Sequence, residues 1–386
     1  MKIYLDYNGT TPVDPAVRQE MLPFLGDLFG NPSSTHWAGQ EARTTINKGR
    51  EQLANLIGAQ ADEIVFTGCG SESDNLAIKG TAWSCCQQDL TKAHVITSAV
   101  EHPAVMNCCA FLEKWGVEFT YLDVDRDGMI TADQVEAAIN ERTILVSLML
   151  ANNETGVIFP LEEISRITRS HDILLHTDAV QAVGKIPVDV NRLGVDLLSL
   201  SGHKFYAPKG IGALWIRSGV KLEPLVHGGG QELGRRSGTE AVPNIVAVGK
   251  AASLLEPGNL DKEVKRLAKL RDDLEAELAE KLQRVIFHGQ RAERLPNTTN
   301  FSLPGIDGES LQMHLDLQGI AVSTTSACAS GNGRGSRVLR AMGVSEAEAK
   351  SALRVSIGRW TTPTEIRQFI DILVEVAASL WRISPL

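Results

Sequence analysis

Two polar residues that follow apolar runs indicate what chemistry this sequence could perform. Lys204 follows the run 195–200 through Ser-Gly-His-Lys, and Asp178 ends the run that begins at Ile173. A lysine at the end of a buried strand loses part of its preference for the charged form, and its free amine can form a Schiff base with a carbonyl. A pyridoxal phosphate (PLP) enzyme needs that lysine on the aldehyde and a carboxylate on the pyridinium nitrogen. The pair therefore indicates PLP chemistry, although Lys204 taken alone could also be a surface turn residue.

The elements that must position these residues are strands of a parallel sheet. Apolar runs alternate with helical segments, which predicts a doubly wound, largely parallel α/β sheet. Open parallel sheets bind ligands outside the carboxyl ends of their strands, so strands that end near Asp178 and Lys204 would place both side chains at one edge. His102 follows a further predicted strand, His94–Ser98. It could stack on a cofactor ring and move protons, or it could be a structural histidine.

Two segments near predicted strand ends could hold a phosphate. Ser201 and His203 place a hydroxyl and an imidazole beside the lysine, as a phosphate anchor needs. After the strand Ile64–Thr67, small residues from Gly68 lead into a helix predicted from about Leu76, where free N–H groups would face an anion. A plain helix cap would explain the same residues. The run lacks the G-x-G-x-x-G pattern, so a dinucleotide is not expected there.

The second half of the chain predicts a smaller domain. A charged helix is expected over Asp261–Leu282 as a connector, and short strands and helices alternate from about Arg284. We expect a large cofactor-binding domain of residues 15–257 and a smaller α+β domain made of residues 1–14 and 258–386.

Composition restricts the class of protein. The 386 residues are 43% hydrophobic and 22% charged, as in soluble globular proteins. The net charge of −9 argues against nucleic acid or an anionic membrane as the main partner. No apolar run approaches the roughly 20 residues that span a bilayer. The first residues also lack the apolar core of a signal peptide, so we expect a cytoplasmic protein.

Cys328 differs in its surroundings from the other five cysteines. No pair of cysteines has C-x-x-C spacing, and the two Cys-Cys doublets fall in predicted helices. Cys328 instead lies in the small, polar, Gly-rich run 323–335, which should be a mobile loop. A PLP site and a mobile thiol together suggest one reaction class. The thiolate would attack the sulfur of an amino acid substrate, keep it as a persulfide and carry it to an acceptor.

The motifs that carry these residues, taken in order, resemble a known family. The chain is similar, nearly end to end, to cysteine desulfurases of the NifS/IscS group, within the class V aminotransferase-like enzymes of PLP fold-type I. The matching motifs are Leu5-Asp6-Tyr7-Asn8, Gly30-Asn31-Pro32-Ser33-Ser34, Gly70-Ser71-Glu72-Ser73-Asp74-Asn75, Glu101-His102, Asn152-Asn153-Glu154, Asp178-Ala179-Val180-Gln181, Ser201-Gly202-His203-Lys204, Arg236-Ser237-Gly238-Thr239, Ser326-Ala327-Cys328 and Leu353-Arg354-Val355-Ser356.

The resemblance implies a role for each site residue. Lys204 is the implied Schiff-base lysine, and Asp178 is the implied partner of the pyridine nitrogen. Gln181 is the implied donor to the phenolic oxygen of the cofactor, and His102 is implied to stack on its ring. The implied phosphate holders are Gly70, Ser71, Ser201 and His203, with Thr239 reaching in from a second subunit. Asn153 is implied to lie beside the cofactor near the substrate, and Arg354 is implied to bind the substrate carboxylate. Cys328 is the implied persulfide carrier and a possible ligand of a shared iron–sulfur cluster.

The activity that this resemblance implies is conversion of L-cysteine to L-alanine. The sulfur would go to an iron–sulfur scaffold or another acceptor protein. The resemblance also implies a homodimer. The sequence departs from the family pattern around the loop, with Thr325 where a glycine is usual and Gly333-Arg334-Gly335 in place of a Glu-Pro. These departures affect the reach of the loop and the docking of a partner. An aminotransferase, a selenocysteine or C–S lyase, or a sulfur carrier without turnover are the alternatives.

Overall fold

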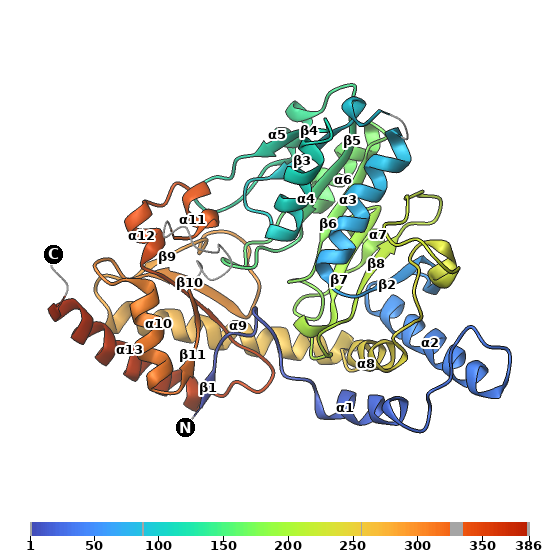
Figure 1. Cartoon of the computed structure of the whole chain (residues 1–386). Coiled ribbons are helices and arrows are strands. Elements are labelled where there is room, and N and C mark those ends of the chain that lie inside the picture. Colours follow the sequence, from blue (N-terminus) through green and yellow to red (C-terminus); the bar gives the residue numbers. More distant parts are fainter. Residues whose placement is uncertain (1, 87–88, 256, 325–334, 384–386) are drawn as a thin grey trace.

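A seven-stranded sheet forms the centre of the larger part of the protein. We describe a computed structural model that covers residues 2–86, 89–255, 257–324 and 335–383 (Figure 1). A single strand, β8, breaks the parallel arrangement of this sheet, because it pairs antiparallel with both of its neighbours, β2 and β7. In spatial order the strands are β2 (Ile64–Thr67), β8 (Gly212–Ile216), β7 (Leu197–Ser201), β6 (Leu174–Asp178), β5 (Thr143–Met149), β3 (His94–Ser98) and β4 (Glu118–Leu122).

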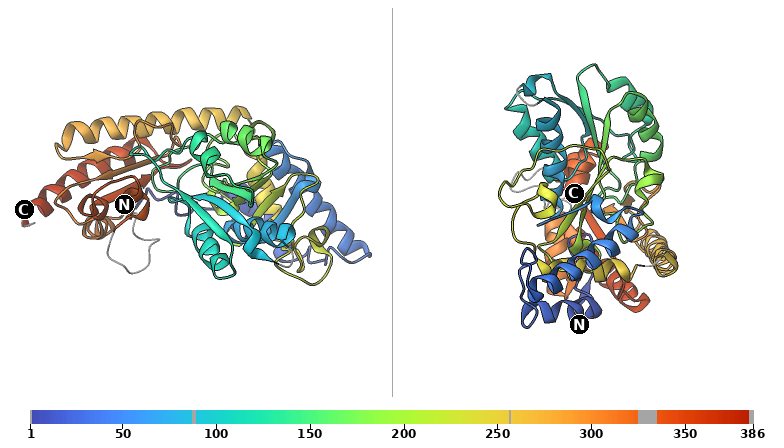
Figure 2. Two further views of the ribbon diagram at one scale, coloured as in Figure 1. Left: turned by 90° about the horizontal axis from the view of Figure 1, so that it is seen from above. Right: turned by 90° about the vertical axis from the view of Figure 1, so that its right-hand side faces the viewer.

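Helices cover both faces of this sheet. Figure 2 shows α3 and α4 on one face and α6 on the other. The bounds are α1 (Pro15–Met21), α2 (Trp37–Leu56), α3 (Gly70–Cys86), α4 (Pro103–Glu113), α5 (Ala132–Ala138), α6 (Leu161–Ser170), α7 (Val190–Leu193), α8 (Val242–Ser253) and α9 (Pro257–Lys281). The predicted doubly wound α/β architecture is therefore confirmed.

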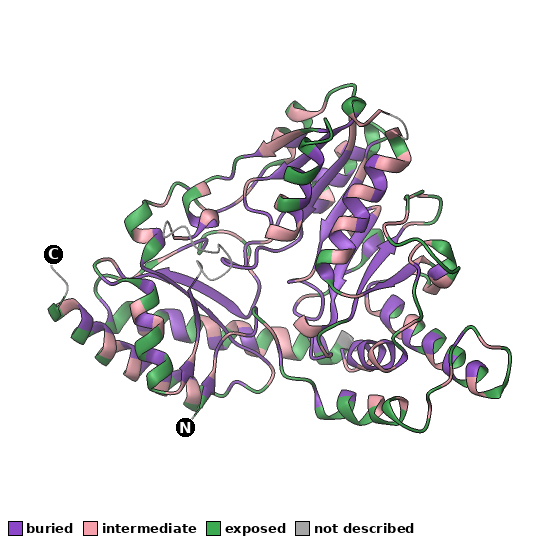
Figure 3. Ribbon diagram, in the orientation of Figure 1, coloured by how far each residue is buried: buried purple, intermediate pink, exposed green. Residues whose placement is uncertain are grey.

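The alternation of side chains along each strand explains why the sheet needs two helical layers. Successive side chains of a strand point to opposite faces. In β7, Leu197 packs with the cluster under α3 and α4, whereas Leu198 packs with the cluster on the other face. Leu214 and Trp215 of β8 divide in the same way. Strands β2, β3, β7 and β8 are accordingly buried at every position, whereas the edge strand β4 is exposed or partly exposed over residues 118–121 (Figure 3).

A second, smaller layer of strands is assembled from both ends of the chain. Its antiparallel sheet has the order β12-β13-β10-β9, and β1 pairs in parallel with β11. The bounds are β1 (Ile3–Tyr4), β9 (Ile286–Phe287), β10 (Thr298–Ser302), α10 (Gly308–Leu317), β11 (Ile320–Ala321), β12 (Ser323–Thr324), α11 (Arg337–Ala341), α12 (Glu346–Lys350), β13 (Ala352–Ser356) and α13 (Pro363–Ile383).

The long helix α9 joins the two parts, as the charged run predicts (Figure 1). Apolar residues of α9 and α13, such as Leu274 and Phe369, form the core beneath the small sheet. Val338 and Leu339 of α11 pack instead with the core of the large sheet. The division into residues 15–257 and residues 1–14 with 258–386 stays a prediction. Within the described residues, no helix combines the length and the apolar character needed to cross a membrane.

Candidate active site

The candidate site lies where two central strands end. Asp178 is the last residue of β6, and Ser201 is the last residue of β7. The two strands are parallel, with Asp178 in register with Ser199. A 3-10 turn, Gly202–Lys204, follows β7 directly. The expectation that Asp178 and Lys204 follow neighbouring strand ends therefore matches the fold.

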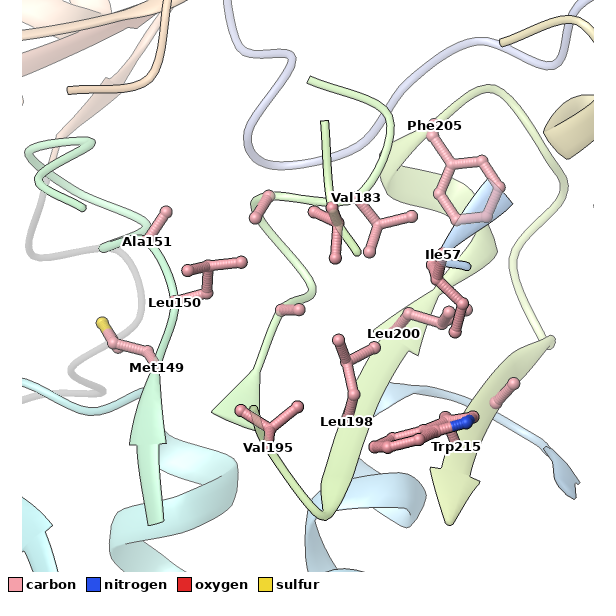
Figure 4. Close-up of a cluster of buried hydrophobic side chains, with 14 of the residues drawn as sticks. Ile57, Met149, Leu150, Ala151, Val183, Val195, Leu198, Leu200, Phe205 and Trp215 are labelled. Carbon is pink, nitrogen blue, oxygen red and sulfur yellow. The ribbon is translucent and has the colours of Figure 1, made fainter. Parts of the chain in front are cut away.

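Tight packing beneath this edge fixes the ends of the strands. Figure 4 shows Leu198 and Leu200 of β7 beside Trp215 of β8, with Phe205 above them. All four side chains are at most 1% exposed. Close packing in a core leaves little freedom for backbone movement. The turn that carries Lys204 is thus bounded on both sides by a rigid core.

Lys204 extends from this turn to the N-terminal segment of the chain. Its Nζ atom donates hydrogen bonds to the backbone carbonyl oxygen of Asn8 at 2.6 Å and to that of Gly9 at 2.8 Å. The residue is partly buried. The 6–9 segment therefore lies against the amine that the sequence predicts to be the nucleophile.

Asp178, His102 and Lys204 form a cluster of titratable groups. The Asp178 carboxyl group is buried and accepts a hydrogen bond from the Val180 N–H at 2.9 Å. Burial raises its pKa, and the charges of His102 and Lys204 oppose that rise. His102 caps α4, where its Nδ1 accepts from the Ala104 N–H at 3.2 Å. Burial lowers the pKa of His102, which favours a neutral imidazole able to accept a proton.

The N-terminus of α3 lies against the end of β7. The helix begins at Gly70, so the prediction of a start near Leu76 was wrong, because small residues with weak helix propensity still suit a first turn. A Cβ atom on Gly70 would lie 2.7 Å from Val180 Cγ2 and 3.4 Å from Ser201 Cβ. Only glycine permits this approach. Free N–H groups of the first turn, together with Ser201 and the exposed Ser71, suit a bound anion.

His203 is tied to the N-terminal segment. Its Nδ1 lies 3.0 Å from Thr10 Oγ1, and its carbonyl oxygen accepts from the Thr11 N–H at 2.9 Å. Burial, followed by the positive charges of Lys204 and Lys209, lowers the pKa of His203 to about 4. The imidazole is therefore neutral at pH 7 and contributes a hydrogen bond rather than a charge.

Thr239 occupies a different environment. It is exposed in the loop 235–241, which an ion pair between Arg236 Nε and Glu72 Oε1 at 2.8 Å holds near the start of α3. The predicted contribution of Thr239 to a second copy of the chain stays a prediction.

Arg354 approaches the site from β13. One terminal nitrogen donates to the Asn153 carbonyl oxygen at 3.0 Å, and the other pairs with Asp6 Oδ1 at 2.7 Å. Its side chain is 6% exposed. The Nε atom is buried without a hydrogen-bond partner among the described residues. A buried guanidinium with an unused N–H is suited to a carboxylate ligand.

The residues at this edge fit a cofactor with an anionic group, a ring nitrogen and an aldehyde. PLP, the cofactor that the sequence predicts, has all three groups. The start of α3 at Gly70 with Ser201 offers the anion site, and Asp178 offers a carboxyl group. Lys204 offers an amine. Gln181 uses one Nε2–H on the Asn8 carbonyl oxygen at 3.0 Å and retains a second N–H for a ring oxygen.

Comparison with known proteins agrees with this geometry. The family model for aminotransferase class-V matches residues 3–369. The chain belongs to the class-V aminotransferase family. A protein of Dictyoglomus turgidum named cysteine desulfurase IscS is 49% identical over 386 residues, which cover 100% of this chain and 96% of the relative. Another protein with that name, from Methanosarcina thermophila, is 46% identical over 384 residues. The match covers 100% of this chain and 94% of the relative.

Solved structures extend the family likeness to three dimensions. A NifS-like protein superposes with a TM-score of 0.91 at 38% identity, covering 98% of this chain and 100% of its own. A structure described as SspA in complex with cysteine has a TM-score of 0.82 at 38% identity. The match covers 94% of this chain and 100% of the SspA chain. The predicted resemblance to the NifS/IscS group is confirmed.

The predicted persulfide carrier, Cys328, lies outside the described residues of this family member. Before that gap, Ser323 of β12 pairs with Arg354 of β13. After the gap, the Ser336 hydroxyl donates to Glu154 Oε2 at 2.5 Å. The described residues that flank this run therefore contact Arg354 and Glu154, which adjoins Asn153 in the sequence.

Three residues to which the sequence assigned no specific contact join the site. Asp6 pairs with Arg354, Asn8 binds Lys204 through its carbonyl, and Lys185 binds the side chains of Asn8 and Gln181. One signal was visible, since Lys185 is a single cation within the otherwise uncharged run 179–188.

Proposed function

We propose that this protein is a PLP-dependent cysteine desulfurase, which converts L-cysteine to L-alanine and holds the sulfur as a persulfide on Cys328. One observation carries the proposal: Asn8 bonds both to the amine of Lys204 and to the carbonyl of Asn153 on which Arg354 rests. A nucleophilic amine and a carboxylate-binding guanidinium thus flank one asparagine. That arrangement suits an amino acid, and the relatives named cysteine desulfurase support cysteine as the amino acid.

The chain's own residues would divide the work as follows. When bound, the cofactor supplies an electron sink for a carbanion at the substrate Cα. Lys204 would hold the cofactor through its aldehyde, and its free amine would be placed to move a proton at the substrate Cα. Neutral His102 accepts a proton near the same edge. Asp178 holds the ring nitrogen, and Arg354 orients the substrate carboxylate with both partners of its guanidinium already fixed.

The sulfur step conserves atoms and electrons. The Cys328 thiolate attacks the sulfur of the substrate, a new S–S bond forms, and the C–S bond breaks. The carbon that carried sulfur gains a proton and becomes the methyl group of alanine. One cysteine and one enzyme thiol therefore give one alanine and one persulfide. Further turnover requires an acceptor thiol to take the sulfur.

Partners follow from this chemistry. The acceptor is proposed to be an iron–sulfur scaffold or another sulfur-accepting protein, with Cys328 as a possible shared cluster ligand. The active form is proposed to be a homodimer, because Thr239 is exposed on a loop anchored at the start of α3 and would reach the phosphate of a second copy.

The deciding experiment mixes the purified full chain and PLP with L-cysteine, with and without a thiol reductant. We expect alanine and sulfide in equal amounts with reductant, and much slower alanine formation after the first turnover without it, because L-cysteine is then the only acceptor thiol. Absence of alanine would refute the proposal. Alanine formation that survives Cys328→Ala would favour the lyase alternative, and an oxo acid product would favour an aminotransferase. A purified protein that binds no PLP would favour a carrier without turnover.

A further inference from the structure

Lys185 is a buried lysine at the site, and its partners are neutral. Its exposed fraction is 7%. Its Nζ atom donates to Asn8 Oδ1 at 2.8 Å and to the side-chain oxygen Oε1 of Gln181. Burial lowers its pKa well below the usual value, and the positive charges of Lys204 and Arg354 lower it further. Both of these hydrogen bonds from Nζ go to uncharged amide oxygens.

A buried lysine without a carboxylate partner is costly to keep. A methionine or leucine could fill a similar volume at lower cost, so packing alone is a weak reason for this residue. The chemical difference is the amine, which donates hydrogen bonds whether it is charged or neutral. Its two acceptors are both amide oxygens, and this choice of partners indicates what the amine does.

The side-chain amides of Gln181 and Asn8 are nearly symmetric in shape, so a rotation exchanges oxygen and nitrogen. The Lys185 amine draws both oxygens toward it, and Asn297 Nδ2 also donates to Asn8 Oδ1 at 3.1 Å, whereas Lys185 is the donor to Gln181 Oε1. The nitrogen of Gln181 therefore turns to the Asn8 carbonyl oxygen, and its second N–H remains for the site. The nitrogen of Asn8 turns to the Asn153 carbonyl oxygen at 3.3 Å and to Thr298 Oγ1 at 2.9 Å.

We propose that Lys185 is a positioning residue that fixes the Gln181 amide with its nitrogen, and not its oxygen, toward the cofactor. The proposal rests on the proposed function, because it takes the acceptor to be an oxygen of PLP. Without Lys185, only the hydrogen bond from Gln181 Nε2 to the Asn8 carbonyl oxygen would hold this orientation, and the amide would present an oxygen to an oxygen for part of the time. Cofactor binding would weaken through the loss of this orientation, because the donors of Lys185 go to side-chain oxygens of the chain itself.

The test is a double-mutant cycle on the full-length protein. PLP dissociation constants are measured by titration of the PLP-free protein for wild type, Lys185→Met, Gln181→Met and the double variant. We expect Lys185→Met to raise the dissociation constant about tenfold in the wild-type background, which is about 1.4 kcal/mol. In the Gln181→Met background we expect less than a twofold further change. An equal change in both backgrounds, or no change in either, would overturn the proposal.

Two further variants keep the test decisive. Lys185→Gln retains an N–H donor, and we expect its affinity for PLP to be close to that of wild type. If Lys185→Met does not fold, Lys185→Gln and Gln181→Glu take its place in the test. Gln181→Glu keeps an acceptor for Lys185 but removes the donor to the cofactor, so affinity should fall, and an unchanged affinity would refute the role. Lys209→Met, which removes an exposed cation near the site, is the matched control.

The readout also separates this inference from the proposed function. It measures binding of PLP and the melting temperature of the PLP-free protein, not turnover of cysteine. Failure of the wild-type protein to form alanine would reject the desulfurase assignment and leave the cycle interpretable. A normal desulfurase with additive variants would reject the role of Lys185 alone.

Discussion

The Nζ atom of Lys204 lies 2.6 Å from the carbonyl oxygen of Asn8, a residue 196 positions earlier in the chain. The same oxygen accepts from Gln181 Nε2 at 3.0 Å. The turn at Asn8 also connects through its backbone N–H to the Ser356 hydroxyl at 2.9 Å. A single turn near the N-terminus therefore links the proposed cofactor residues of the large sheet to β13, the strand of Arg354.

The first prediction concerns Lys204. We expect Lys204→Ala to remove the visible absorbance of the PLP-bound protein, because no amine remains to form the covalent bond to the aldehyde. The side chain is only partly buried, so the PLP-free protein should melt within a few degrees of wild type. Absorbance spectra and thermal melts measure both effects. Lys209→Ala is the control, and an unchanged spectrum of Lys204→Ala would contradict the assignment.

The second prediction concerns the substrate carboxylate. Arg354→Lys replaces a planar group that is held on two sides, by Asp6 and the Asn153 carbonyl, with a single ammonium. A hydrogen bond to a charged group contributes roughly 1.5–3 kcal/mol, so KM for cysteine should rise about 10- to 100-fold while kcat falls less. Steady-state alanine formation measures this split. The control is Arg359→Lys, at a partly buried arginine that pairs with the carboxylates of Asp14 and Glu263, and it should leave KM near wild type.

The third prediction concerns the sulfur carrier. We expect Cys328→Ala to abolish sulfide release from cysteine and to leave PLP absorbance intact, because the thiol acts on the substrate and not on the cofactor. Cys69→Ala, at an exposed thiol next to Gly70, is the matched control and should retain sulfide release. Sulfide production by Cys328→Ala at the wild-type rate would reject the persulfide role.

The fourth prediction concerns Glu101, a buried carboxyl group beside the site. Its Oε1 accepts from the Ser98 hydroxyl at 2.7 Å and from the Met149 N–H at 3.0 Å. Burial raises its pKa to about 8. Between pH 4.5 and pH 8 the folded protein therefore keeps a proton that the unfolded chain releases, so the free energy of unfolding falls as pH rises.

Glu101→Gln cannot ionise and should flatten this decline. The Glu101 contribution is at most about 1.4 kcal/mol per pH unit. Urea unfolding of the PLP-free protein at pH 5, 6.5 and 8 measures the slope for wild type and for the variant. Glu51→Gln, at an exposed position, controls for the loss of a glutamate side chain. An identical slope in wild type and Glu101→Gln would contradict the buried-acid interpretation.

Local patterns alone predicted much of the large sheet. The strands Ile64–Thr67 and His94–Ser98 begin and end where the apolar runs do. The period of two between faces and the bounding turn residues determine strands without reference to distant contacts. Parallel strands share their carboxyl ends, so Asp178 and Lys204 could be placed at one edge from their positions after two runs. The start of α3 was misplaced, because Gly70 and Ser71 carry little helical preference of their own.

By itself the sequence determined the class of fold, the two polar residues at the strand ends and the unusual surroundings of Cys328, since each depends on residues close together in the chain. Only the tertiary structure decided that Asp6 meets Arg354 across 348 positions and that Lys185 binds Asn8 across 177. Such contacts depend on how the N-terminal segment crosses between the two sheets, and no local periodicity encodes that path. The buried polar contacts that hold Gln181 and Arg354 in place were therefore visible only in three dimensions.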